Sequence, residues 1–87
     1  MRAIYKYPLK VLDEQEVMMP KGARILAVQT QREAPCLWAE VELGAELQLR
    51  IIEVFGTGHP IDERPRKYLG TFQLLNGDFL GHVFERA

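Results

Sequence analysis

The segment Gly56-Thr57-Gly58-His59 carries the residue types best suited to chemistry in this chain. Two glycines around a threonine allow the backbone to curl so that successive N–H groups converge on one anion. Basic residues follow within eight positions of His59, and such groups hold phosphate or carboxylate through charge-assisted hydrogen bonds. The ligand-binding residues that we predict are therefore Gly56, Thr57, Gly58, His59, Arg64, Arg66 and Lys67.

A plainer interpretation of the same segment stays open. The glycines would simply end a strand, and the basic residues would form the solvated start of the next strand. The segment is not a dinucleotide or P-loop fingerprint, because the strand–turn–helix context and the full glycine spacing are absent.

Two histidines and one cysteine are the other reactive side chains. A zinc site needs three or four converging ligands, usually with one short spacing, whereas Cys36, His59 and His82 are widely separated. We therefore predict no metal site and no cofactor. Cys36 is expected to be a small buried apolar residue rather than a nucleophile. His82 lies between Leu80 and Phe84 on one strand face, where a hydrogen-bonded core or rim histidine is the usual outcome.

Trp38 is expected to point out of the protein core. Residues 36–43 alternate as in a strand, and one face carries Leu37, Ala39, Val41 and Leu43. Trp38 therefore lies on the opposite face, beside Glu40. An outward tryptophan on a strand can contact a partner protein or stack on a ligand ring. Self-association as a homodimer is the partner contact that we expect first.

Alternating apolar residues and Gly/Pro turns predict the elements that position these side chains. The expected strands are 3–9, 14–19, 24–31, 36–43, 47–55, 68–75 and 79–85. The last two flank Asn76-Gly77, a pair that favours a type I′ turn, and residues 56–66 read as a loop. We predict one all-β domain over residues 1–87, with six or seven short antiparallel strands in a small barrel, roll or two-sheet sandwich, most simply ordered as a meander.

One strand breaks the simple alternation. Ile51 and Ile52 are adjacent, which indicates either a β-bulge or a strand that is buried on both faces. The helix-forming residues 45–50 are too few for a stable helix, so a strand is the preferred prediction.

Composition bounds the class of protein. The 87 residues begin with Met, as expected for a complete gene product, and their net charge of −1 lacks the basic excess usual in nucleic-acid binders. A single cysteine favours a reducing compartment. Neither a signal peptide nor a transmembrane segment is expected, and the predicted location is the cytoplasm.

Several segments together resemble a known family. They are Tyr5-Lys6-Tyr7-Pro8-Leu9, Met19-Pro20-Lys21-Gly22-Ala23, Pro35-Cys36-Leu37-Trp38-Ala39, Gly56-Thr57-Gly58-His59-Pro60-Ile61, Gly70-Thr71-Phe72-Gln73 and His82-Val83-Phe84-Glu85. This set is similar to a family of small uncharacterised proteins of tailed bacteriophages and prophages. The resemblance spans nearly the whole chain and implies a phage or prophage accessory protein acting in the bacterial cytoplasm, with no functional residue carried over.

The sequence therefore predicts a binding protein rather than an enzyme, because no catalytic constellation is recognisable. Its partner would be a host protein or an anionic, nucleotide-like small ligand. A small enzyme using His59 or His82 is one alternative, and a minor virion or assembly component is another.

Overall fold

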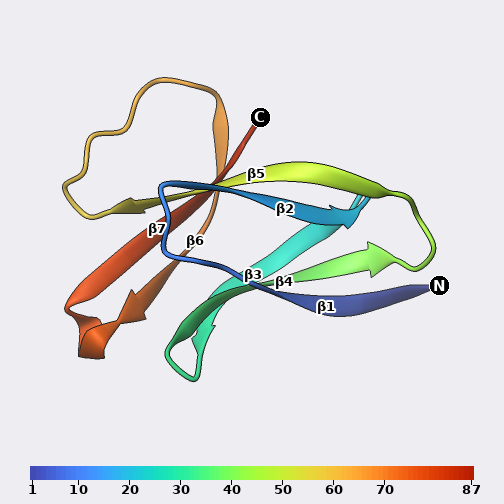
Figure 1. Cartoon of the computed structure of the whole chain (residues 1–87), viewed down its shortest axis with the longest axis horizontal. Coiled ribbons are helices and arrows are strands. Elements are labelled where there is room, and N and C mark those ends of the chain that lie inside the picture. The colour runs from blue at the N-terminus through green and yellow to red at the C-terminus, as the bar shows by residue number, and fades with distance from the viewer.

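Seven strands form where the sequence alternates, and they build two antiparallel sheets packed face to face (Figure 1). The computed structural model describes all 87 residues. The strands are β1 (Arg2–Pro8), β2 (Glu14–Pro20), β3 (Arg24–Gln31), β4 (Ala34–Glu42), β5 (Leu47–Gly56), β6 (Arg66–Leu74) and β7 (Phe79–Arg86). The all-β prediction is confirmed, and of the architectures that it left open the sandwich is the one formed.

The order of the strands differs from the predicted meander. One sheet has the order β1-β4-β3 and the other β2-β5-β7-β6. Only β3 with β4 and β6 with β7 pair as consecutive neighbours, because the chain crosses between the sheets after β1, β2 and β4. A meander in one sheet would leave an apolar face uncovered, whereas the crossings give each sheet a partner for its inner face.

Strand β4 supplies the centre of the core. Leu37, Ala39 and Val41 are each at most 1% exposed, as their alternation predicts. Leu43 is 39% exposed instead of buried, because β4 ends at Glu42 and leaves it in the following turn.

The four-stranded sheet covers this surface with inner-face residues from each of its strands: Met19, Ile52, Val83 and Phe72. The Phe72 ring lies directly over Gly81, where an added Cβ would be only 2.3 Å from Phe72 Cζ. Glycine at position 81 is therefore required for the ring to reach the core.

Strand β5 is buried on both faces along its central part. Its register with β2 and β7 is regular, so no bulge lies at Ile51-Ile52. Ile52, Glu53 and Val54 are at most 5% exposed in succession. Burial of the outward-facing Glu53 requires a cover on the outer side of the sheet.

The hairpin between β6 and β7 turns at the predicted pair. Asn76 (φ 54°, ψ 34°) and Gly77 (φ 90°) have left-handed backbones, and the Asp78 N–H donates to the Leu75 carbonyl at 3.0 Å, as in a type I′ turn. The connection is longer than the predicted two residues, because the last paired residues are Leu74 and Phe79. This turn is the only helical segment, and nothing in the structure is a helix able to cross a membrane.

Candidate functional site

The outer face of the four-stranded sheet holds the polar and aromatic side chains of interest. Alternation along β5 places Glu53 and Phe55 on this face, since Ile52 and Val54 point into the core. The same alternation on β7 places His82, Phe84 and Arg86 there. The loop of residues 57–65, which extends from the end of β5 in Figure 1, returns to β6 beside this face.

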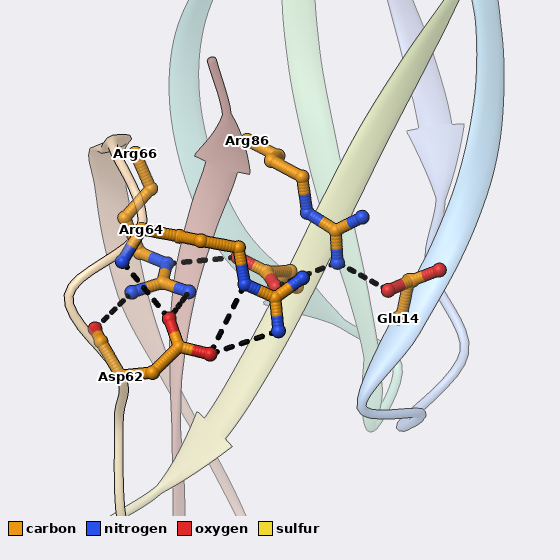
Figure 2. A network of polar contacts seen from close by, with 6 residues as sticks. Glu14, Asp62, Arg64, Arg66 and Arg86 are labelled. Carbon is orange, nitrogen blue, oxygen red and sulfur yellow. Dashed lines mark hydrogen bonds and ion pairs between the residues drawn. The ribbon is translucent and has the colours of Figure 1, made fainter.

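Glu53 is the buried centre of an ionic network. Its side chain is 5% exposed and accepts hydrogen bonds from Arg66 at 2.9 Å and from Arg86 at 3.0 Å. Arg86 also bonds Glu14 on β2 (Figure 2). Side chains of β6 and β7 therefore meet on a carboxylate of β5, and Arg86 links them to β2.

Asp62 attaches the loop to this network. Arg66 donates to the Asp62 carbonyl at 2.6 Å and to its carboxylate at 2.9 Å. Arg64 donates two hydrogen bonds to the same carboxylate, from Nε at 3.1 Å and from Nη2 at 2.8 Å. Figure 2 shows both. We call Glu14, Glu53, Asp62, Arg64, Arg66 and Arg86 the Glu53 cluster.

The pKa values in the Glu53 cluster follow from these contacts. Burial alone would raise the pKa of Glu53, but the hydrogen bonds from Arg66 and Arg86 outweigh it and the pKa is lowered. Hydrogen bonds from the Arg64 side chain and backbone, and then from Arg66, hold the pKa of Asp62 far below its usual range. Glu53 and Asp62 are thus partnered by guanidinium groups in their ionised form.

A hollow of about 450 Å³ lies over the Glu53 cluster, but the carboxylates that line it outnumber the arginines by four to three. Its lining includes the three arginines and also Asp13 with the three carboxylates of the cluster. An anion entering this hollow would have to displace a carboxylate from an arginine that it already holds. Electrostatics therefore favour structure over anion binding at this end of the face.

A second hollow, of about 280 Å³, lies at the other end of the same face. Phe55, Phe84 and Tyr68 line it as a row of rings, with centroids 5.7 Å apart in the first pair and 5.3 Å in the second. Both pairs are arranged edge to face. We call this hollow, together with the 56–61 segment that borders it, the aromatic recess.

Two imidazoles face the aromatic recess. His82 bridges two hydroxyl groups, with Nε2 2.8 Å from Thr57 Oγ1 and Nδ1 3.0 Å from Thr71 Oγ1. The His59 ring packs against Gly56, where an added Cβ would lie 2.9 Å from its Cε1 atom. Glycine at position 56 thus allows His59 to fold back against the end of β5.

The structure divides the predicted ligand-binding residues between two places. The segment from Gly56 to His59 borders the aromatic recess, whereas Arg64 and Arg66 belong to the Glu53 cluster. His59 also lines the hollow over the Glu53 cluster, so it lies between the two places. Lys67 is in neither place, because it follows Arg66 on β6 and so points to the other face, in register with Glu85.

Trp38 lies on the other sheet. It is half-buried on the outer face of β4, between Lys6 of β1 and Ala27 of β3. Its orientation away from the core agrees with the prediction. Since the sandwich core separates the two outer faces, Trp38 cannot stack on a ring held in the aromatic recess.

Sequence reasoning missed the most connected residues of the site. Glu53 was not recognised as buried, and Phe55, Tyr68 and Thr71 were assigned no role. A signal existed for one of them, since Thr71 falls in the segment Gly70-Thr71-Phe72-Gln73, which carries part of the family resemblance. No group of three or more His, Cys, Asp or Glu side chains is arranged to hold a metal ion.

Comparison with known proteins places the chain in a family. Residues 1–87 match the family described as domain of unknown function DUF7352, and the chain belongs to it. Neither a curated protein nor a solved structure matches the chain.

Proposed function

We propose that this chain is a phage or prophage accessory protein that captures a nucleotide-like ligand, a planar ring with an anionic group, in the aromatic recess. The observation that carries the proposal is the row of three aromatic rings beside two imidazoles in one hollow of ring-accepting size. The phage context is supported by the resemblance of the sequence segments described above.

The ring of the ligand would pack against the aromatic side chains. Tyr68 is 55% exposed and offers the most open ring surface, and Phe84 is half-buried beside it. Phe55 is half-buried too, and the Arg66 guanidinium already lies over its ring, 5.2 Å from the centroid. Stacking of a base on an aromatic side chain contributes about 1–3 kcal/mol. It tolerates different bases, because every base presents a π-face.

The anionic group would be held by the loop next to the rings. Gly58 has a left-handed backbone (φ +88°) in a tight turn, where the His59 N–H donates to the Gly56 carbonyl at 3.1 Å. The Thr57 hydroxyl and the His59 imidazole lie on either side of Gly58 in the sequence and both line the recess. Arg64, whose side chain is 57% exposed, is the accessible guanidinium of the Glu53 cluster and would have to leave Asp62 to assist. Arg66 stays with Glu53, because its side chain is only 7% exposed.

Calorimetric titration with mononucleotides and cyclic nucleotides tests this function. We expect binding at about micromolar concentration once entropic costs are met. The variants Tyr68→Ala and His59→Ala should weaken binding at least tenfold. Arg64→Ala should weaken it less, with Arg24→Ala, an exposed arginine of the other sheet, as the matched control.

Two results would overturn the proposal. One is the absence of binding at millimolar ligand, and the other is unchanged affinity in both Tyr68→Ala and His59→Ala. Capture of a host protein through the Trp38 face, or a place as a minor virion component, would then become the better explanation. The variant Trp38→Ala distinguishes nucleotide binding from a protein contact, since it should leave the first intact and impair the second.

We further propose that the chain acts as a homodimer. A chain of 87 residues has a small core, and Met18, Leu47 and Leu49 are each 47% or more exposed on the outer face of β2 and β5. Sedimentation equilibrium at micromolar concentration should give twice the 10.0 kDa mass of one chain. A single 10.0 kDa species would contradict the dimer without affecting the ligand site.

A further inference from the structure

A continuous chain of hydrogen bonds runs along one side of the aromatic recess. The Tyr68 hydroxyl is 2.5 Å from Thr71 Oγ1, which is 3.0 Å from His82 Nδ1. His82 Nε2 is in turn 2.8 Å from Thr57 Oγ1. Four side chains from β6, β7 and the loop after β5 are therefore connected by three short contacts.

These hydrogen bonds hold the His82 ring in one orientation, with a hydroxyl group at each nitrogen. A neutral imidazole has one nitrogen that donates and one that accepts. These contacts are compatible with either neutral tautomer of His82. In the tautomer with hydrogen on Nδ1, Nδ1–H donates to Thr71 Oγ1 and the Thr71 hydroxyl donates to the Tyr68 oxygen. Nε2 is then the acceptor, and the Thr57 hydroxyl donates to it. A hydroxyl that donates to an imidazole, which a third group orients from behind, is the arrangement of an activated nucleophile.

We propose that Thr57 is a nucleophile activated by His82 and that it accepts the acyl group of an aryl ester bound in the aromatic recess. The aryl part is indicated by the rings of Phe55, Tyr68 and Phe84, which line the same hollow as Thr57 and His82. Thr71 is a positioning residue, because it reaches the reaction only through His82 Nδ1. Tyr68 adds its hydroxyl to this contact from behind Thr71, while its ring lines the recess.

The reaction is balanced without any further reagent. Thr57 Oγ1 attacks the ester carbonyl carbon while its proton passes to His82 Nε2. The bond from that carbon to the aryl oxygen then breaks, and the leaving phenolate takes the proton from His82. The products are a phenol and acyl-Thr57. Water, deprotonated by His82, can attack acyl-Thr57 to give the carboxylic acid and free Thr57.

A purely structural role predicts something different. In that case the Thr57–His82 contact only attaches the loop to the sheet, and the Thr57 hydroxyl reacts no faster than that of an ordinary exposed threonine.

In the proposed reaction, no carboxylate lies behind His82 to strengthen it as a base. Deacylation should therefore be slow, and the acylated protein should accumulate.

The test is incubation of the full chain with 4-nitrophenyl acetate, followed by peptide mapping by mass spectrometry and by release of 4-nitrophenolate. We expect an acetyl group on Thr57, at a rate that falls at least tenfold in His82→Ala and His82→Asn. Thr57→Ala should lose the label, and Thr57→Ser should keep it. Thr71→Val should change the pH profile of acetylation, which a merely structural contact would not do.

Background reactions need their own controls. Lysines, the N-terminus and His59 also react with this reagent, so only the label mapped to residue 57 counts. If circular dichroism shows that His82→Ala does not fold, Thr71→Val replaces it as the test variant. No label on Thr57, or equal labelling in folded His82→Asn, would overturn the proposal. Nucleotide binding plays no part in this assay. Failure of the Thr57 proposal is therefore distinguishable from failure of the proposed ligand function.

Discussion

Two regions on one face of the four-stranded sheet use polar side chains in opposite ways. In the Glu53 cluster, Glu53 and Arg66 are 5% and 7% exposed, and every carboxylate has a guanidinium partner. In the aromatic recess, Tyr68 is 55% exposed and His59 lies at the surface. The first region closes around Glu53, with Glu14, Asp62 and Arg64 more than half exposed at its rim, whereas the second has the Tyr68 ring open to solvent.

This difference separates stability from function. A buried charge whose partners are all present costs much to disturb and offers little to a ligand. Open rings and imidazoles contribute less to folding and can bind a partner. The arginines that suggested an anion site from sequence thus belong to the stabilising region, and the glycine-threonine-histidine segment belongs to the binding region.

The largest expected effect is on stability, at the centre of the Glu53 cluster. Glu53→Gln keeps the side-chain volume but leaves Arg66 and Arg86 without their buried counter-charge. We expect the free energy of unfolding to fall by about 3 kcal/mol, the low end for a broken buried pair, because Arg86 and Asp62 retain contact with water. Urea denaturation measures this loss. Glu42→Gln, at an exposed ion pair, is the matched control and should change stability little.

Lowering the pH should gradually remove the contribution of ionised Glu53 to the free energy of unfolding. The folded pKa of Glu53 is lowered from its ordinary value of 4.5, so its contribution to stability is complete above that value. It is lost as pH falls through 4.5 and then through the lower folded pKa. The stability difference between the native chain and Glu53→Gln should therefore shrink from pH 7 to pH 3. A difference that stays constant would show that the charge of Glu53 does not stabilise the fold.

The smallest of these stability effects should come from the aromatic recess. His82→Ala removes two hydrogen bonds at a half-buried position, and each contributes about 0.5–1.5 kcal/mol. We expect a loss of about 1 kcal/mol, well below that of Glu53→Gln, together with loss of ligand binding. A loss larger than that of Glu53→Gln would reverse the comparison between the two regions.

Alternation allowed most strands of the fold to be predicted from sequence. Leu37, Ala39 and Val41 show it clearly, because one strand face meets the core and the other does not. The strand order could not be predicted, since crossings between sheets depend on which faces need covering and leave no local pattern. The turn at Asn76-Gly77 was predictable because left-handed backbone is a local property of those residues.

The candidate site was predictable only where its residues are close in sequence. The 56–59 segment drew attention through its glycines and His59. Glu53 gave no signal of burial, because the residues that cover it, Arg66 and Arg86, are distant in the sequence and meet it only after β5, β6 and β7 pair. The same pairing brings Thr71 to His82, so the chain of hydroxyl groups could not be read from spacing.

The most direct test of this account is an amide nuclear magnetic resonance titration of the native chain with a mononucleotide. If the aromatic recess is the binding region, the resonances of Thr57, His59, Tyr68 and His82 should shift with a common affinity. Those of Glu14, Glu53 and Arg86, in the closed region, should stay in place. Shifts centred on the Glu53 cluster, or no shifts at millimolar nucleotide, would contradict the account.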